Sequence, residues 1–331
     1  MWAVAPYQEP EDGSRPGGAA TIHRVEMEDP SAGPGEVVLE IAGSALNRAD
    51  LLQMRGLYPP PPGASPVPGL ECSGTVVAVG DGVDQSWLGR EVMALLAGGG
   101  HATRVAVPAS QLMAVPEGLD LVEAAALPEV ALTSWTNLVY EGRLARGESV
   151  LISGAASGVG TFAVQMARDL GARVLVAGRS LERLEALQEL GADECLELGE
   201  DLPERAREAT GGGVDLVIDL VGGEHFPRLL GCLRSRGRLV LVGILAGRSC
   251  EVDLGTVLRG RLEVRGSVLR SRSLEEKAGL VASFANYAEP RFASGALRPV
   301  IDRVVPFDDV ADAYAAMQAG GLFGKLVLRM R

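Results

Sequence analysis

The segment from residue 150 to residue 171 most constrains what this chain can fold into. Residues 150–152 form a short apolar run that is typical of a buried strand. A glycine-rich turn follows over residues 154–160, where glycine permits a tight turn and lets a ligand approach the backbone closely. Apolar side chains then recur every four residues over 161–171, which indicates a helix. A helix that begins in this way directs free N–H groups at whatever lies above it, so the segment predicts a pyrophosphate site.

The glycine spacing alone leaves two interpretations open. It departs from the strict G-x-G-x-x-G pattern, because Ser157 stands where a third clustered glycine is expected, and a plain strand–helix connection would look similar. The following sequence favours the binding site. A second apolar strand is predicted at 173–177 and an amphipathic helix at 181–190, so the segment forms the βαβ unit that a nucleotide fingerprint requires.

Composition limits the classes of partner. The chain has 331 residues, a net charge of −12 and a pI of about 4.9, so its surface should repel nucleic acid and anionic membranes, although the charge also simply aids solubility. No apolar run is long enough to span a bilayer, and residues 1–12 show no secretory pattern. The four cysteines are dispersed, which is typical of a reducing compartment, and we predict a cytoplasmic protein.

The order of predicted elements indicates two domains. Residues 1–124 contain short strands separated by glycine and proline, which suggests a mostly β, partly closed structure. Residues 125–269 alternate strands with helices and predict an α/β, doubly wound parallel sheet of the Rossmann type. Residues 270–331 return to mixed structure, and we expect this tail to fold back onto the N-terminal part, so that the Rossmann domain is an insert.

Motifs along nearly the whole chain point to one family. The chain resembles the zinc-free, zeta-crystallin-like quinone oxidoreductases of the medium-chain dehydrogenase/reductase superfamily. The resemblance implies a GroES-like, partly closed barrel domain around the Rossmann insert, and a homodimer that pairs through the edge strand predicted near residues 262–268. The motifs that carry it are Ser44–Leu51, Tyr58–Ser65, Met93–Gly100, Leu127–Glu129, Ser157–Gly160, Leu269–Arg272 and Gly324–Leu328.

The resemblance also makes an absence informative. Zinc-dependent members of the superfamily carry a Gly-His-Glu ligand motif, whereas this chain has Gly69-Leu70-Glu71, with leucine in place of the imidazole. A cysteine ligand near Asn47 and the cysteine cluster of the structural zinc are missing too. Since three protein ligands are needed for a catalytic zinc, we predict no metal site.

The predicted cofactor residues form two groups. One group would bind the pyrophosphate, and the other would determine whether NADPH or NADH binds. The turn residues predicted to cradle the pyrophosphate are Gly154, Ser157, Gly158, Val159 and Gly160. By resemblance, further cofactor contacts are expected from Thr133, Gly243, Leu245, Phe323 and Lys325. Thr133 could equally be a helix residue with a satisfied hydroxyl, and Lys325 a surface cation.

The end of the second strand favours NADPH over NADH. An acidic residue there would hold the ribose diol of NADH, but the strand ends in Ala177-Gly-Arg-Ser180. Arg179 could pair with a 2′-phosphate and Ser180 could donate to it. The alternative is that Arg179 is an ordinary solvated side chain.

Asn47 and Tyr58 are the predicted catalytic residues. By resemblance, Asn47 lies beside the nicotinamide, where its amide could hydrogen-bond a quinone oxygen. Tyr58 could donate a proton or stack on a ring, or could be an exposed aromatic in a proline-rich loop. These residues predict an NADPH-dependent reductase of quinones or conjugated carbonyl compounds. Alternatives are an NADPH-dependent alkene reductase of the same fold and an NADPH-binding structural or sensing protein with little turnover.

Overall fold

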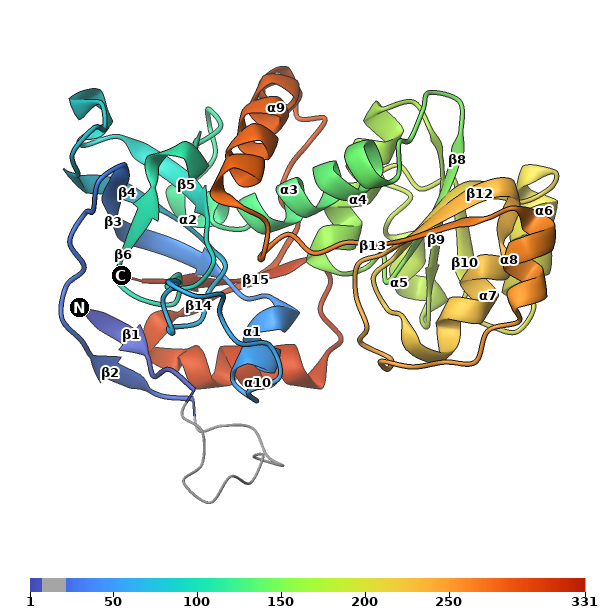
Figure 1. The fold of residues 1–331 in the computed structure, drawn as a ribbon, viewed down its shortest axis with the longest axis horizontal. Coiled ribbons are helices and arrows are strands. Elements are labelled where there is room, and N and C mark those ends of the chain that lie inside the picture. The colour runs from blue at the N-terminus through green and yellow to red at the C-terminus, as the bar shows by residue number, and fades with distance from the viewer. Residues whose placement is uncertain (8–21, 331) are drawn as a thin grey trace. The chain divides into compact units, whose positions relative to one another are not determined.

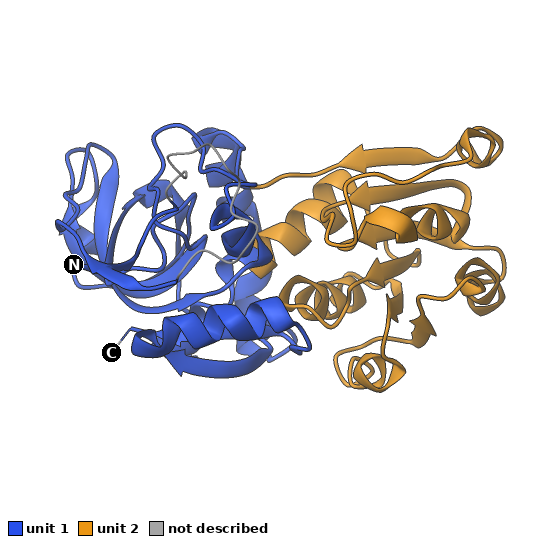
Figure 2. Ribbon diagram, turned by 90° about the horizontal axis from the view of Figure 1, so that it is seen from below, with its two compact units in different colours: residues 1–129, 270–331 blue, residues 130–269 orange. Residues whose placement is uncertain are grey.

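The computed structural model describes residues 1–7 and 22–330 (Figure 1), so residues 8–12 of the N-terminal stretch considered above lie outside the described residues. The chain forms two compact units (Figure 2). Unit 1 comprises residues 1–129 and 270–331, and unit 2 comprises residues 130–269. The first boundary lies five residues beyond the position expected from the sequence, within a helix, and the second lies at the expected position.

Unit 2 is built on a six-stranded sheet in which every pairing is parallel. The strand order is β10-β9-β8-β11-β12-β13, so the direction of winding reverses between β8 and β11. This order confirms the doubly wound Rossmann fold, whose ligands bind where the order reverses. The strands are β8 (Ser149–Ser153), β9 (Arg173–Gly178), β10 (Glu194–Glu197), β11 (Val214–Asp219), β12 (Leu233–Leu241) and β13 (Glu263–Gly266).

Helices cover both faces of this sheet (Figure 2), as parallel strands that are apolar on both sides require. The core between the layers includes Leu151, Leu175, Val217 and Leu239, all fully buried. The helical elements are α3 (Pro128–Trp135), η3 (Thr136–Glu141, a π-helical turn), α4 (Gly158–Asp169), α5 (Leu181–Glu185), α6 (Leu202–Thr210), η4 (Gly223–His225), α7 (Phe226–Gly231) and α8 (Leu254–Gly260).

The predicted helices of unit 2 differ from the observed ones mainly in length. The helix predicted over 161–171 is confirmed as α4, which begins three residues earlier, whereas the one predicted at 181–190 is regular only over α5. Helix α7 is also short, ending at Gly231, because β12 already begins at Leu233.

Unit 1 contains a seven-stranded sheet, with β6 pairing to β3 beside the path β14-β15-β3-β4-β5-β7. The tail predicted to return to the N-terminal part does so, because β15 pairs antiparallel with β3. A separate ribbon joins β1 to β2. The strands are β1 (Trp2–Val4), β2 (Arg24–Glu26), β3 (Glu36–Ala45), β4 (Glu71–Val79), β5 (Glu91–Leu95), β6 (Arg104–Pro108), β7 (Leu112–Ala114), β14 (Ile301–Pro306) and β15 (Lys325–Arg329).

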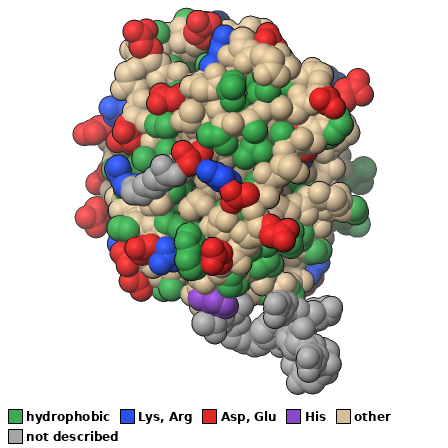
Figure 3. Space-filling view, turned by 90° about the vertical axis from the view of Figure 1, so that its left-hand side faces the viewer, with side chains coloured by type: hydrophobic (Ala, Val, Ile, Leu, Met, Phe, Trp, Pro, Cys, Tyr) green, Lys and Arg blue, Asp and Glu red, His purple; other side chains and the backbone are tan. Residues whose placement is uncertain are grey.

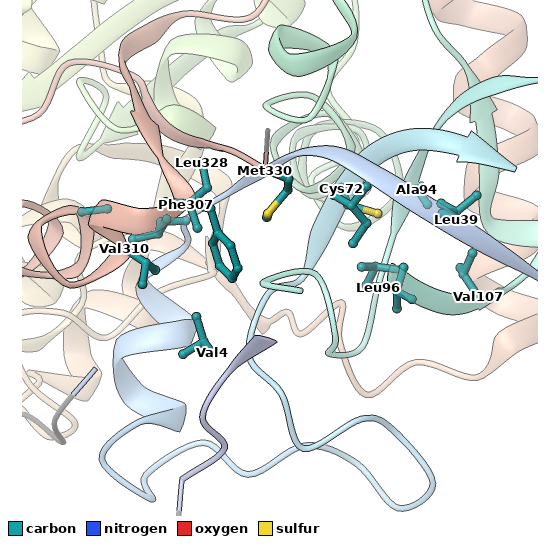
Figure 4. Close-up of a cluster of buried hydrophobic side chains, with 14 of the residues drawn as sticks. Val4, Leu39, Cys72, Ala94, Leu96, Val107, Phe307, Val310, Leu328 and Met330 are labelled. Atoms are coloured by element: carbon teal, nitrogen blue, oxygen red, sulfur yellow. The ribbon is translucent and has the colours of Figure 1, made fainter. Parts of the chain in front are cut away.

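The core of unit 1 joins distant parts of the sequence. Figure 4 shows Phe307 and Met330 from the C-terminal part beside Leu39 and Cys72 from β3 and β4. Asp308, just before α10, pairs with Arg24, which precedes it by 284 positions. The helical elements are α1 (Arg48–Gln53), η1 (Gln85–Trp87), η2 (Ala109–Gln111), α2 (Leu121–Ala124), α9 (Leu274–Ala293), η5 (Phe307–Asp309) and α10 (Val310–Ala319).

The surface agrees with the acidic composition. On the face drawn in Figure 3, acidic side chains are spread widely, with lysine and arginine between them rather than gathered into one basic area. Among the described residues, no helix combines the length and apolar character needed to cross a membrane.

Candidate cofactor and substrate sites

The glycine-rich turn after β8 forms a backbone cradle in unit 2. Gly154 has a φ of 66°, a conformation that side chains rarely adopt. A Cβ on Gly160 would lie 2.4 Å from the carbonyl oxygen of Ala155, so only glycine fits there. Ser157 caps α4, and its Oγ accepts a hydrogen bond from the N–H of Gly160 at 3.2 Å. The remaining N–H groups of the first turn, which includes Gly158 and Val159, have no partner within the helix and can bind an anion.

A buried serine–aspartate pair fixes this turn at the point where the strand order reverses. Ser153 at the end of β8 donates its hydroxyl to Oδ1 of Asp219 at 2.8 Å. The same carboxylate oxygen accepts from the N–H groups of Val221 and Gly222, each at 2.9 Å. Asp219 therefore holds together the carboxyl ends of β8 and β11. This pair was not predicted from the sequence, although an aspartate that ends an apolar strand is a detectable signal.

The residues predicted to give preference for NADPH over NADH follow β9, the next strand of the sheet. Arg179 is exposed, and within the described parts of the chain no side chain or carbonyl group accepts from its guanidinium. Ser180 occupies the cap position of α5, but its hydroxyl makes no capping hydrogen bond. Both polar groups are therefore available at the same edge of the sheet as the glycine-rich turn, and no acidic side chain ends β9.

The other residues predicted to bind cofactor in unit 2 lie at this edge or at α3. Gly243 follows β12, where its N–H donates to the carbonyl oxygen of Asp219 at 3.1 Å. Leu245 is 56% exposed just beyond it. Thr133 in α3 is buried, and Ser134 beside it donates to the carbonyl oxygen of Val159 at 3.4 Å. The structure thus brings α3 to the start of α4.

In unit 1, Asn47 and Lys325 meet at a buried carboxylate that the sequence did not suggest as a site residue. The Lys325 ammonium donates to Oδ1 of Asn47 at 2.7 Å and to Oε1 of Glu71 at 2.7 Å. It also donates to the carbonyl oxygen of Leu46 at 2.8 Å, so all its hydrogens are used. Lys325 is 4% exposed, which rules out the surface-cation alternative and directs its charge into unit 1.

The backbone conformation of Gly324 allows Lys325 to reach this position. Its φ is 93°, and a Cβ there would lie 2.2 Å from the carbonyl oxygen of Val300. Phe323, just before it, donates its N–H to Oδ1 of Asp302 at 2.9 Å. Phe323 and Lys325 therefore belong to unit 1 with Asn47, whereas the other predicted cofactor residues belong to unit 2.

A second buried acid holds the backbone of Asn47. Asn47 occupies the cap position of α1, and its N–H donates to Oδ2 of Asp50 at 2.7 Å. Oδ1 of Asp50 accepts from the N–H of Gly69 at 3.0 Å. Behind this carboxylate lies His101, whose Nδ1 is 2.7 Å from the Tyr314 hydroxyl. Burial lowers the pKa of His101, so the imidazole remains neutral near pH 7.

Tyr58 stacks against an arginine instead of lying free in its loop. The guanidinium of Arg270 lies 5.0 Å from the centre of the Tyr58 ring. Arg270 is itself fixed, because it donates to the carbonyl oxygens of Ala97 and Tyr58 and to Oε1 of Gln53 at 2.6–3.1 Å. Burial raises the pKa of the Tyr58 phenol, which therefore keeps its proton at neutral pH. Arg270 lies in a family motif, but nothing in the sequence pairs it with Tyr58.

Comparisons with known proteins identify the family. The alcohol dehydrogenase GroES-like domain matches residues 33–117, and the zinc-binding dehydrogenase domain matches residues 158–285. The chain is 32% identical over 316 residues to the synaptic vesicle membrane protein VAT-1 homolog of Rattus norvegicus, covering 90% of this chain and 78% of the relative. The quinone oxidoreductase of Thermus thermophilus, solved also with NADPH, superimposes with a TM-score of 0.83 at 35% identity, covering all of both chains. The chain belongs to the zinc-free quinone oxidoreductase family of the medium-chain dehydrogenase/reductase superfamily.

The quinone oxidoreductase fold extends over the whole chain. The Escherichia coli quinone oxidoreductase, solved in complex with NADPH, superimposes with a TM-score of 0.88 at 26% identity, again covering all of both chains. The chain is thus an oxidoreductase of this family. The GroES-like match lies within unit 1, and the zinc-binding dehydrogenase match covers most of unit 2 and the first residues of the segment that returns to unit 1.

A zinc ion does not fit the residues present, although one matching domain is described as zinc-binding. Leu70 offers no ligand atom, and Asn47 is already bound to an ammonium group that would repel a cation. Across residues 1–7 and 22–330, no group of three or more histidine, cysteine, aspartate or glutamate side chains is arranged to hold a metal. These residues therefore cannot hold a zinc ion that would polarise a carbonyl group.

Proposed function

We propose that this chain is a zinc-independent NADPH:quinone oxidoreductase. The observation that carries the proposal is the carboxyl edge of the unit 2 sheet, where the glycine-rich cradle lies beside Arg179 and Ser180. Family members of the same fold solved with NADPH support the choice of cofactor. The overall conversion adds one hydride and one proton to the quinone and gives a hydroquinone.

In this proposal, unit 2 binds the cofactor. The N–H groups at the start of α4 receive the pyrophosphate, and Gly160 leaves room for its close approach. Arg179 and Ser180 bind the 2′-phosphate, which NADH lacks. Thr133, Gly243 and Leu245, together with Phe323 of unit 1, are proposed as further contacts. The bound nicotinamide supplies the hydride equivalent, and the protein supplies orientation and the proton.

Unit 1 supplies the residues that act on the substrate. Tyr58 is proposed as the proton donor, since burial keeps its phenol protonated and Arg270 fixes the ring. Asn47 is proposed to contact the substrate near the carbonyl group that is reduced. Lys325 contributes through Asn47 rather than by a direct contact with the cofactor, because all its hydrogens are used within unit 1.

The deciding experiment is a parallel titration with NADPH and NADH followed by intrinsic tryptophan fluorescence, then oxidation of the tighter-binding cofactor by an ortho-quinone. We expect preference for NADPH and quinone-dependent turnover. NADPH binding with turnover only on a conjugated alkene would replace the quinone reductase by an alkene reductase. NADPH binding with no turnover on either acceptor would leave a binding protein, and preference for NADH would contradict the role of Arg179.

We also propose a homodimer in the cytoplasm. β13 is the edge strand of the unit 2 sheet, and Val264 on it and Val268 beyond it are 47% and 51% exposed. On α8, Leu254 and Leu258 are 76% and 79% exposed. A second copy that paired through this edge would bury these side chains and satisfy the open strand.

A further inference from the structure

The side-chain amide of Asn47 lies between two opposite charges. Its Oδ1 accepts from the Lys325 ammonium at 2.7 Å, and its Nδ2 donates to Oε1 of Glu71 at 2.9 Å. Glu71 is fully buried, and its other oxygen accepts from the N–H of Glu129 at 2.9 Å. The amide is therefore held by groups that cannot turn toward solvent.

This arrangement fixes which end of the amide faces which way. An ammonium group can only donate, and an ionised carboxylate can only accept. Rotating the Asn47 amide by 180° would place its NH₂ against Lys325 and its oxygen against Glu71. Both hydrogen bonds would become repulsive contacts in a buried region, where unmade bonds to charged groups are costly.

The same contacts decide what Asn47 can still offer a ligand. One hydrogen of Nδ2 is bound to Glu71, and Nδ2 also donates to the carbonyl oxygen of Ala45 at 3.3 Å. The backbone N–H donates to Asp50. Oδ1 has two lone pairs, of which Lys325 uses one. The N–H of Asp50, in the capping box of α1, donates to the backbone carbonyl oxygen of Asn47 at 3.0 Å and makes no hydrogen bond to Oδ1. The remaining capacity of the side chain is thus one acceptor, whereas the sequence suggested a donor to a quinone oxygen.

We propose that Glu71 and Lys325 are positioning residues that hold Asn47 as a hydrogen-bond acceptor for a ligand hydroxyl. A quinone carbonyl offers only acceptor atoms, whereas the hydroxyl that reduction creates is a donor. Asn47 therefore binds the reduced, hydroxylated form of the substrate in preference to the quinone. This inference rests on the proposed function, which places Asn47 beside the substrate.

The cost of burying the pair supports a role beyond stability. Taking two charges out of water is expensive, and an apolar pair of similar volume is often no less stable. The chain nevertheless places a lysine in the buried face of β15 and a glutamate at the start of β4, with glycine at position 324 to admit the lysine. These two charges fix a single orientation of the Asn47 amide, which an apolar pair could not do.

A double-mutant cycle tests the coupling. The kcat/KM for an ortho-quinone is measured for the wild type, Asn47→Ala, Lys325→Met and the double variant. We expect Lys325→Met to lower kcat/KM on the order of tenfold or more, and to add no further loss in the Asn47→Ala background. Losses that multiply in the double variant would overturn the proposal, as would a Lys325→Met variant as active as the wild type.

Two further variants separate positioning from folding. Lys325→Met leaves Glu71 unpaired and could unfold the chain, so Glu71→Gln combined with Lys325→Met provides a version without an isolated buried charge. It should show the same loss of activity. Glu148→Gln, which breaks the pair between Glu148 and Arg238 in unit 2, is the matched control and should lower Tm without changing kcat/KM.

A nuclear magnetic resonance measurement does not depend on turnover. The side-chain NH₂ signal of Asn47, identified by its loss in Asn47→Ala, should exchange slowly with solvent in the wild type and quickly in the Glu71→Gln, Lys325→Met variant. Equal exchange rates in the two proteins would overturn the proposal that Glu71 and Lys325 hold the Asn47 amide. If the signal exchanges slowly in a wild type that reduces no quinone, the positioning of Asn47 by Glu71 and Lys325 is supported and the proposed function is refuted.

The acceptor role has its own test. Inhibition by a hydroquinone is compared with inhibition by its dimethyl ether, which has the same ring but no hydroxyl donor. We expect the wild type to bind the hydroquinone more tightly and Asn47→Ala to lose that preference. A preference that survives in Asn47→Ala would show that the hydroxyl binds elsewhere.

Discussion

At the scale of single residues, Arg179 places an exposed positive charge at the carboxyl end of β9. Replacing it by alanine should weaken NADPH binding about 10- to 100-fold, the range expected for loss of a charge-assisted hydrogen bond. Binding of NADH, which has no 2′-phosphate, should change little. Fluorescence titration with both cofactors measures the two effects.

Arg173→Ala is the matched control for that variant. Arg173 lies at the opposite end of the same strand and pairs with Glu194 at 3.1 Å, so its loss should leave both affinities unchanged. If Arg173→Ala weakens NADPH binding as much as Arg179→Ala, the effect is one of general charge and the assigned contact is wrong.

The protonation of Tyr58 gives a prediction about pH. Burial raises the pKa of its phenol, so the proton remains available through neutral pH and is lost only as the pH rises through that raised value. Tyr58→Phe should lower kcat about 10²-fold or more and should remove the loss of kcat at high pH.

Tyr287→Phe is the corresponding control. Its ring also lies under a guanidinium, that of Arg291 at 4.0 Å, but in α9 and outside the proposed site. It should leave kcat and its pH profile unchanged. A Tyr58→Phe variant with wild-type kcat would limit Tyr58 to packing against Arg270.

At the scale of elements, the start of α4 depends on the space beside Gly160. Gly160→Ala should destabilise the protein by about 1–3 kcal/mol, as overpacking does, because the new Cβ would meet the carbonyl oxygen of Ala155. It should also displace the N–H groups that are proposed to bind the pyrophosphate, and so weaken NADPH binding. Thermal unfolding with and without NADPH measures both effects.

Gly279→Ala in α9 controls for the substitution itself. A Cβ there would meet no atom within 4 Å, and alanine favours a helix over glycine by about 0.5–1 kcal/mol. It should therefore raise Tm slightly and leave NADPH binding intact. If Gly160→Ala and Gly279→Ala have the same effect on Tm and on NADPH binding, the close contact between Gly160 and the carbonyl group of Ala155 is not critical.

Elements with a strong apolar pattern could be predicted from the sequence, and those without one could not. The strand before the glycine-rich turn and helix α4 after it agree with their patterns closely. Strand β14 was not predicted, because its side chains are only partly buried or exposed and so show no alternation. The π-helical turn η3 reads as ordinary helix, since the shift in hydrogen bonding leaves no mark on residue type.

At the scale of the whole molecule, the exposed apolar side chains on α8 predict an interface. Leu258→Glu should convert the proposed dimer into a monomer, because a carboxylate would lose its water in the contact. Light scattering coupled to size exclusion measures the mass.

Leu88→Glu, at a position that is 54% exposed in unit 1, should leave the mass unchanged. A monomeric wild type would refute the proposed dimer. A Leu258→Glu variant with dimer mass would show that the interface lies on another surface.

The sequence by itself determined the fold class, the two-unit organisation and the glycine-rich turn that we propose as the pyrophosphate site. All three features depend on patterns among neighbouring residues, namely the spacing of apolar side chains and the glycines of a single turn. The resemblance to relatives added the positions of Asn47, Tyr58 and Lys325 as candidates.

Only the tertiary structure decided what those residues do to one another. Asn47 and Lys325 are 278 positions apart, and Tyr58 and Arg270 are 212 apart. Their contacts arise because β15 returns to pair with β3 and because the chain re-enters unit 1 at Arg270. The acceptor character of Asn47 follows from Glu71 and Lys325, and no local pattern reports which buried charges will face a given amide.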